Sequence, residues 1–243
     1  IETPANLWKF EDAADPRPNS IRIFNFVEDL GKHFGGTKVM ITNDANAAAI
    51  GEMVFGNARG MKDFAMITLG TGLGSGIVCN GEMVYGNDGF AGEYGHIAVA
   101  SRETGRQCGC GRKGCLEAYV SATGIKRTAF ELMATMTCDS ELRSVPYDKF
   151  EAKMLSDAAA KNDPIALEAF ERTGKVLGLA LADLTAITSP EAIILFGGLA
   201  NAGEYIMRPT HKYMEENQLM VFKGKVKLLM SGIQDKNVAI LGG

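Results

Sequence analysis

The chain has 243 residues, of which 46% are hydrophobic and 22% charged, and its formal net charge is −4. This composition is typical of a soluble globular protein with one large or two modest domains. A negative charge without a run of basic residues argues against binding nucleic acid through its phosphates. No apolar stretch reaches the roughly 20 residues of a membrane-spanning helix, and no secretory signal is evident, so we expect neither a membrane nor a nucleic-acid partner for this segment.

The first part of the chain predicts a loop, a helix, a strand and a second helix. Prolines punctuate residues 1–18, which favours a loop. Asn19-Ser20 is a helix N-cap signal, and apolar residues recur at helical spacing to about Gly31. KVMIT at 38–42 is expected to form a short strand. The alanine-rich stretch that follows consists of good helix formers.

Asn43 and Asp44 stand between that strand and that helix. The simplest interpretation of Asp44 is a helix cap, because a carboxylate at a helix N-terminus is favoured by the dipole and accepts from free amides. The alternative is a general base at the C-terminal edge of a sheet, where ligands of α/β folds gather. The residues alone do not separate these two interpretations.

A glycine-rich loop, GTGLGSG, occupies residues 70–76 after a predicted buried strand at 64–70. Asn80-Gly81 lies between apolar runs and is a hairpin signal, so the loop is expected to join two strands. This arrangement excludes a Rossmann fingerprint, which needs a following helix, and a P-loop, which needs Gly-Lys-Ser/Thr. The backbone amides and the Thr71 hydroxyl could hold a phosphate, but a plain tight hairpin is the commoner explanation.

The most specific pattern is a histidine followed by three closely spaced cysteines: His96, Cys108, Cys110 and Cys115. Three thiols and one imidazole match a tetrahedral Cys3His zinc site. Disulfide pairing is the alternative, but cysteines one residue apart rarely meet the required geometry, and one of the three would remain unpaired. Metal-binding thiols are typical of a reducing compartment, so we expect a cytoplasmic protein.

A zinc ion held by four protein ligands has no open position for a substrate, so this zinc would be structural. Its expected role is to hold the loop at 96–115 rigid. Two carboxylates, Glu93 and Glu117, flank that loop. The metal would therefore place these carboxylates.

The second half of the chain alternates predicted helices and strands, which indicates α/β layering. Helices are expected at 116–134, interrupted near Thr123-Gly124, and at 150–161, with a loop at 135–148. Asp163-Pro164 is an N-cap followed by proline at the first helical position and predicts a long helix to about Thr188. The remaining elements are expected as a strand at 192–198, a helix at 202–217 and a strand at 226–230.

Three segments, NDANAAAIGE, LGTGLGSGIV and GEYGHIAV with CGCGRKGCLEAYVS, together resemble the ROK family (repressors, open reading frames and sugar kinases). The resemblance covers almost the whole chain. It implies an α/β protein with the actin-like, ribonuclease H-like ATPase fold, two lobes around a cleft. Residues 1–58 would be the remainder of the smaller N-terminal lobe, and 59–243 the larger lobe with the zinc loop (96–115) inserted.

Two parts of the family pattern are missing, the first phosphate loop (an Asp-x-Gly-Gly-Thr hairpin near the N-terminus) and the final helix. The chain is therefore expected to be truncated at both ends and to bind nucleotide poorly as written. The family's regulators carry an upstream helix-turn-helix, which the N-terminal part of a longer protein could supply.

The resemblance also implies an activity, the ATP-dependent phosphorylation of a hexose hydroxyl, with glucose as first candidate and a homodimer as the expected assembly. Asp44 would be the general base. The sugar would be bound by Asn43, Glu93, His96 and Glu117, with Asn6 as a weaker correspondence. ATP with Mg²⁺ would lie on Gly70, Thr71, Gly72, Gly74, Gly197 and Gly198, and structural Zn²⁺ would be held by the Cys3His set. The alternatives are a sugar-sensing transcriptional regulator of the same family, or a kinase for N-acetylglucosamine, N-acetylmannosamine or fructose.

Overall fold

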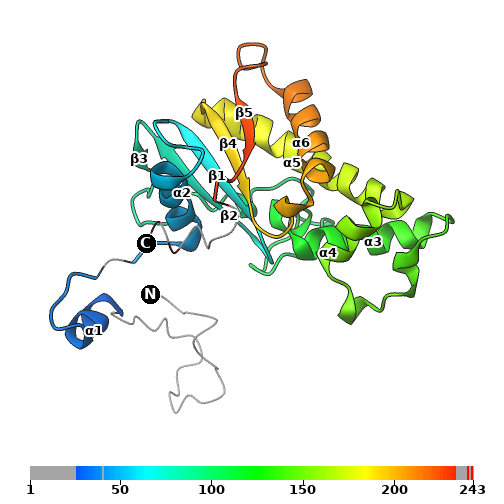
Figure 1. Ribbon diagram of the computed structural model, residues 1–243, viewed down its shortest axis with the longest axis horizontal. Helices are drawn as coiled ribbons and strands as arrows, with labels where there is room; N and C mark the ends of the chain where they lie inside the picture. The colour runs from blue at the N-terminus through cyan, green and yellow to red at the C-terminus, as the bar shows by residue number, and fades with distance from the viewer. Residues whose placement is uncertain (1–25, 40, 234–239, 241, 243) are drawn as a thin grey trace. The chain divides into compact units, whose positions relative to one another are not determined.

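The computed structural model describes residues 26–39, 41–233, 240 and 242 (Figure 1). Its contacts divide the chain into two compact units, Ile1–Thr42 and Asn43–Gly243, which are described separately. Asn6 and the start of the predicted helix at 19–31 lie outside the described residues. The lobe boundary predicted at residue 58 stays a prediction.

The first unit contains one described helix, α1 (Phe26–His33), which ends two residues beyond the predicted Gly31. The strand predicted at 38–42 is wrong for the described residues of that segment, which have no strand conformation. A strand is stabilised by hydrogen bonds to a neighbour, and no described residue pairs with this segment. The local β-propensity of KVMIT is therefore not sufficient.

The second unit is built on a mixed five-stranded sheet with the order β3-β2-β1-β4-β5. The strands are β1 (Phe64–Leu69), β2 (Leu73–Cys79), β3 (Glu82–Met83), β4 (Ala192–Phe196) and β5 (Lys227–Met230). β1, β4 and β5 are parallel, whereas β2 is antiparallel to both β1 and β3. The predicted hairpin is confirmed, since Asn80 and Gly81 both have positive φ (53° and 81°) between β2 and β3.

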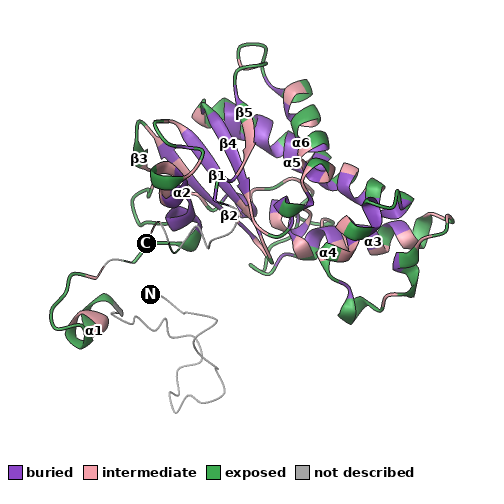
Figure 2. Cartoon of the chain, in the orientation of Figure 1, coloured by how far each residue is buried: buried purple, intermediate pink, exposed green. Residues whose placement is uncertain are grey.

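The two faces of the sheet are covered by different helices. Successive side chains of a strand point to opposite faces, so Phe64 and Met66 of β1 pack in one cluster with Ala48 and Ala49 of α2 (Asp44–Phe55). The alternate residues of β1 pack in the larger cluster with helices from the second half of the chain. Figure 2 shows the strands and the inner sides of these helices as buried.

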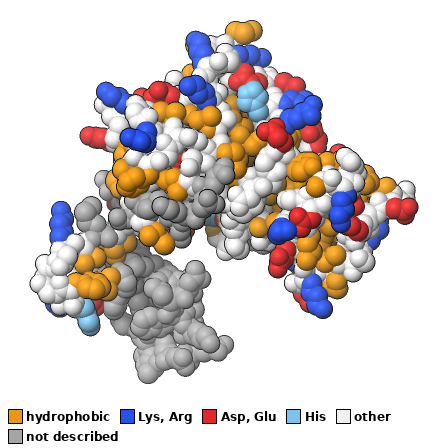
Figure 3. Space-filling view, viewed as in Figure 1, with side chains coloured by type: hydrophobic (Ala, Val, Ile, Leu, Met, Phe, Trp, Pro, Cys, Tyr) orange, Lys and Arg blue, Asp and Glu red, His pale blue; other side chains and the backbone are white. Residues whose placement is uncertain are grey.

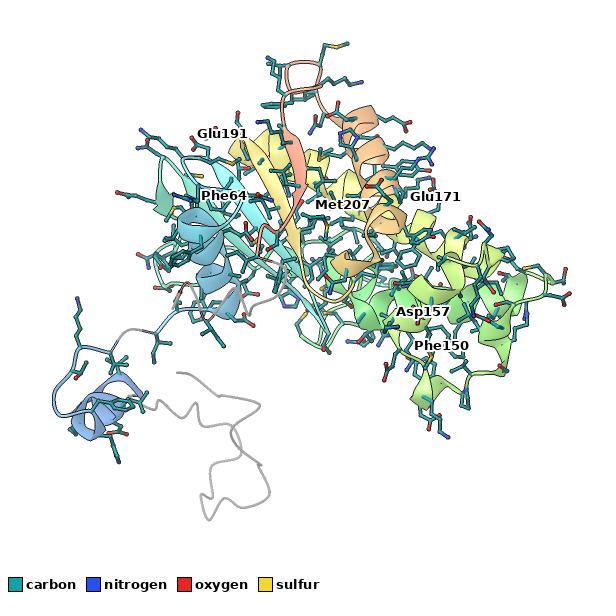
Figure 4. All side chains as sticks on the ribbon, viewed as in Figure 1. Phe64, Phe150, Asp157, Glu171, Glu191 and Met207 are labelled. Carbon is teal, nitrogen blue, oxygen red and sulfur yellow. The ribbon has the colours of Figure 1, made fainter. Side chains whose placement is uncertain are left out.

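The helices on the second face are α3 (Ala122–Thr135), α4 (Ala152–Ala159), α5 (Pro164–Thr188) and α6 (Glu204–Asn217). Asp163 caps α5 as predicted, with Oδ1 accepting from the amides of Ile165 and Ala166 at 3.0 Å each. α5 and α6 pack closely because a Cβ on Gly178 of α5 would meet the Thr210 carbonyl of α6 at 2.5 Å. In Figure 4 Glu171, which accepts a hydrogen bond from Tyr213, lies where these two helices meet.

Two predicted elements differ in detail from those found. The stretch 116–134 forms a short 3-10 helix, η3 (Leu116–Ala118), and then α3. The break comes before Ser121, whose Oγ accepts from the Gly124 amide at 3.0 Å and so caps α3. The expected loop at 135–148 contains two 3-10 turns, η4 (Glu141–Ser144) and η5 (Tyr147–Lys149).

One buried carboxylate ties α2 to the segment after β5. Glu52 is fully buried, and its Oε2 accepts from the amides of Asn57 at 2.8 Å and Gly232 at 3.3 Å. The Ser231 hydroxyl donates to its other oxygen. Hydrogen bonds from neutral donors thus satisfy this acid, with no cation beside it in the described part of the chain.

None of the helices that the structure describes is both long and apolar enough to cross a bilayer. On the face of residues 43–243 visible in Figure 3, acidic and basic side chains are interspersed.

Candidate active site and metal centre

The glycine loops after β1 and β4 lie at one edge of the sheet. β1 and β4 are parallel, with Thr68 beside Phe196, so the segments that follow these two strands leave the sheet at the same end. Gly197 has φ +109°, and a Cβ there would meet the Leu69 carbonyl at 2.6 Å. Ligands of open α/β sheets bind at the carboxyl ends of strands. The fold thus brings together the two glycine segments predicted to bind ATP.

Glycines of β2 let α2 approach the sheet closely. A Cβ on Gly74 would lie 3.0 Å from Cβ of Ala45, and one on Gly76 would lie 2.7 Å from Cβ of Ala49. Because Ala45 follows Asp44 directly, this contact places the start of α2 against the glycine hairpin. The glycines at 74 and 76 are therefore required by packing, whatever ligand the turn itself binds.

The helix cap is Asn43, whose Oδ1 accepts from the Ala45 amide at 2.8 Å. Asp44 is the first helical residue, and its Oδ1 accepts from the same amide at 2.9 Å. Its carboxylate is exposed and makes no ion pair with a residue that the structure describes. Asn43 is therefore sufficient to cap α2, and the exposed Asp44 carboxylate is accessible for chemistry.

A 3-10 turn, η2 (Tyr94–His96), lies against β2, with Glu93 directly before it and His96 as its last residue. A Cβ on Gly95 would meet the Leu73 carbonyl at 2.3 Å, so only glycine permits this approach. The buried Tyr94 hydroxyl donates to the Ala180 carbonyl in α5. Burial, with the nearby charge of Asp183 as a smaller contribution, raises the pKa of Tyr94 well above its usual value.

The four predicted metal ligands come together. The ligand atoms of His96, Cys108, Cys110 and Cys115 all lie within 4.8 Å of one another. Zinc bonds of about 2.3 Å to sulfur and 2.0 Å to nitrogen at tetrahedral angles would separate two sulfurs by about 3.8 Å and a sulfur from a nitrogen by about 3.5 Å. Cys110 Sγ lies 3.7 Å from Cys115 Sγ, and Cys108 Sγ lies 3.7 Å from His96 Nδ1. The donor set and its spacing therefore fit zinc, and all five cysteines are free thiols.

The thiols differ in their readiness to ionise. Burial, the largest cause, raises the pKa of Cys108 to about 12. Burial also acts on Cys110, but hydrogen bonds from the backbone and side chain of Arg112 and from Cys108 outweigh it and lower its pKa to about 6. Without a bound cation the cluster would thus hold a proton on Cys108 at neutral pH.

Glu117 connects this cluster to the glycine hairpin. Its Oε2 accepts from the Leu73 amide at 2.9 Å, and its Oε1 lies 3.4 Å from Cys108 Sγ. A Cβ on Gly72 would come within 2.5 Å of Oε2. On the other side of the cluster, Glu93 Oε2 lies 3.7 Å from His96 Nε2, the ring nitrogen that faces away from the thiols.

The hairpin itself is held by residues that the sequence did not single out. The Ala122 amide donates to the Gly70 carbonyl at 2.9 Å, and the Thr68 hydroxyl accepts from the Gly74 amide at 3.2 Å. The Ser75 hydroxyl donates to the Gly92 carbonyl. No hydrogen bond joins Asp44 to Glu93 or Glu117 in the described part of the chain, so these carboxylates remain separate groups around one hairpin.

The fold and the site together describe an α/β domain with glycine loops at the ends of parallel strands. It carries an exposed aspartate and two carboxylates that lie next to a Cys3His loop. The chain belongs to the ROK family, whose model matches residues 13–242.

Curated relatives and solved structures are similar to the chain over most of its length. It is 43% identical over 180 residues to a glucokinase of Halalkalibacterium halodurans, covering 73% of this chain and 54% of that protein. A ROK family glucokinase from Streptomyces griseus, solved with glucose and AMPPNP, superposes with a TM-score of 0.77 at 33% identity, covering 89% of this chain and 70% of that one.

A ROK family transcriptional regulator, homologous to the E. coli MLC protein, also superposes with a TM-score of 0.77, at 28% identity and covering 89% of this chain and 54% of that one. The fold is thus the actin-like ATPase fold that the resemblance to the ROK family implied. The chain spans little more than half the length of the curated relative from H. halodurans.

Proposed function

We propose that the protein containing this chain transfers the γ-phosphoryl group of ATP to a hydroxyl of a hexose, with glucose as the first candidate. The observation that carries the proposal is that two carboxylate-bearing elements meet at one glycine hairpin, since Gly74 contacts Ala45 beside Asp44 and Gly72 contacts Glu117. The similarity to glucokinases, one of them solved with glucose and AMPPNP, supports the same function.

Asp44 is the proposed general base. A sugar hydroxyl is a poor nucleophile at neutral pH, and a carboxylate within hydrogen-bond reach accelerates its attack about 10²–10⁴-fold by accepting its proton. The exposed Asp44 carboxylate, on a helix that glycines hold against the sheet, suits this role. Asn43, fixed as the helix cap, would present its amide beside it.

The remaining sugar hydroxyls are assigned to Glu93, His96 and Glu117. Carboxylates accept from hydroxyl groups, and fixing the sugar relative to the base and the phosphate supplies much of the rate by orientation. The amides after β1 and β4, at 70–74 and 197–198, would bind the phosphates of ATP. Bound magnesium would neutralise charge on the β- and γ-phosphates.

We assign zinc to His96, Cys108, Cys110 and Cys115 in a structural role. Four protein ligands leave no position for substrate. The metal would fix the loop that carries Glu93 at one end and Glu117 at the other, as supports around a site do. Five unpaired thiols agree with a reducing cytoplasm, which we propose as the location, with a homodimer as the assembly.

The decisive experiment measures ADP release from ATP against a panel of hexoses and N-acetylhexosamines, using the full-length protein with Asp44→Ala as control. Turnover with one sugar that the control lacks would establish the kinase and name its substrate. Sugar binding without turnover would instead favour the sugar-sensing regulator, for which the structural similarity to the MLC homologue is the specific support.

A further inference from the structure

Arg102 lies in the loop between His96 and Cys108, and its guanidinium contacts both ends of the metal-ligand set. Nη1 donates to Cys115 Sγ at 3.2 Å and to the Lys113 carbonyl at 2.9 Å. Nη2 donates to the His96 carbonyl at 3.1 Å. One side chain therefore joins the first ligand residue, the last ligand residue and the turn that leads into the last ligand.

The geometry of these contacts suits arginine. A guanidinium is planar and carries five N–H donors in a fixed fork, whereas a lysine ammonium is a point charge on a flexible stem. Two nitrogens of the fork reach the three acceptors, whereas a lysine would have to reach all of them from a single nitrogen. Arg102 is itself exposed, so its charge alone contributes little. Its effect must come from how it orders the loop.

The contact to Cys115 also holds one ligand atom in place. The hydrogen bond from Nη1 fixes the position of this sulfur relative to the His96 carbonyl, to which Nη2 of the same guanidinium donates. Groups that orient and hydrogen-bond metal ligands in this way change metal affinity considerably.

We propose that Arg102 is a positioning residue that closes the metal centre by tying the His96 carbonyl to the Cys115 sulfur. The residues that bear the sugar-binding carboxylates lie just outside the same two ligands, Glu93 before His96 and Glu117 after Cys115. Fixing the ligands therefore fixes both carboxylates. This inference rests on the proposed zinc site and the proposed sugar binding.

A second arginine in the loop, Arg106, makes different contacts, so the contact with the metal-ligand residues is specific to Arg102. Arg106 donates from Nη1 to the carbonyls of Ala118 and Gly124 and pairs with Glu131 at 2.6 Å. These contacts attach the loop to α3 and reach no metal ligand. A substitution of Arg106 would therefore weaken the attachment of the loop to α3, whereas a substitution of Arg102 would weaken the order of the metal-ligand set. The two effects can be separated.

The first test measures zinc release from the full-length protein to a chromophoric chelator, without ATP or sugar, for wild type, Arg102→Lys and Arg102→Met. Both variants should release zinc about 10–100-fold faster than wild type. Arg208→Lys, an exposed arginine on α6, is the matched control and should release zinc at the wild-type rate. A wild type purified without zinc, or equal release rates in all four proteins, would overturn the proposal. Fast release in Arg102→Met alone would also overturn it, since charge without the fork would then suffice.

The second test measures glucose affinity by calorimetry and the KM and kcat for sugar in the same variants. We expect weaker glucose binding and a raised KM, with kcat changed much less, because the variants disturb the sugar carboxylates and leave Asp44 in place. Unchanged glucose affinity despite fast zinc release would refute the link to the carboxylates. A wild type that binds zinc but phosphorylates no sugar would sink the proposed function while leaving the zinc-release result to judge Arg102.

Discussion

Gly72 lies directly against Glu117, so that a Cβ built on Gly72 would come within 2.5 Å of the Glu117 Oε2 atom. The same oxygen accepts the hydrogen bond from the Leu73 amide at 2.9 Å. The backbone of the proposed phosphate loop and the carboxylate of the proposed sugar site thus determine each other's position. A change on either side should be felt on the other.

Gly72→Ala should therefore displace Glu117 without unfolding the protein. The clashing atom is the end of a flexible side chain, so Glu117 can rotate away, but it loses its bond from the Leu73 amide. The displaced Glu117 carboxylate would no longer bind the sugar hydroxyl assigned to it. Hydrogen bonds to charged groups contribute about 1.5–3 kcal/mol, so the KM for sugar should rise roughly 10–100-fold. Steady-state kinetics measure this, with Gly31→Ala as control because the only described atom near a Cβ there is the Thr37 carbonyl at 3.5 Å. An unchanged KM would show that Glu117 does not bind the sugar.

Asp44→Asn should lower kcat about 10²–10⁴-fold while preserving glucose affinity, because the amide cannot accept the proton but keeps the shape of the side chain. The fold should be unaffected, since Asn43 remains the cap of α2. Calorimetry with glucose and denaturant unfolding check both points. Full turnover in this variant would exclude Asp44 as the base.

Elements with strong local signals were predicted correctly from sequence. The Asp163-Pro164 start of α5 and the Asn80-Gly81 turn depend on side chains and φ angles within a few residues. The strand predicted at 38–42 is wrong because a strand needs a neighbouring strand to pair with, and the local sequence does not show whether one is present. The interruption predicted near Thr123-Gly124 is displaced, because Gly124 lies inside α3, where a Cβ would meet the Tyr119 backbone at 2.5 Å. Close packing, rather than chain flexibility, explains that glycine.

The same distinction applies to the site. The spacing of the cysteines correctly predicted that these side chains come together with His96, because one short loop carries all three of them. Arg102 was missed because its sulfur partner lies 13 residues further along, in a loop whose path is known only from the fold. Tyr94 was missed for the same reason, because the carbonyl that it contacts lies even further away in the sequence, at a separation of 86 residues. Long-range hydrogen bonds leave no periodic pattern to read.

Tyr94→Phe should cost about 1 kcal/mol of unfolding free energy, the usual value of one hydrogen bond. The pKa of Tyr94 is raised in the folded state, so its contribution is fully present below the unfolded pKa of about 10 and is lost as pH rises above it. The difference between wild type and variant should therefore stay constant up to about pH 9 and shrink as pH rises above about 10. Urea unfolding at several pH values measures it, and Tyr147→Phe, an exposed tyrosine, should show no such trend. A difference that stays constant with pH would contradict the assignment.

Zinc binding should release protons, and its affinity should fall as pH falls. Metal binds the thiolate form, and because the pKa of Cys108 is raised to about 12, that thiol must lose its proton at neutral pH. Cys110, with its pKa lowered to about 6, is ionised above that pH and protonated below it. Calorimetric zinc titrations in buffers of different ionisation enthalpy should therefore detect at least one released proton near neutral pH and about one more below about pH 6. Cys138→Ser, a half-buried cysteine outside the cluster, should give the wild-type result. An affinity that does not change across this range would mean that these thiols do not bind the metal, and the structural role assigned to the loop would fail with it.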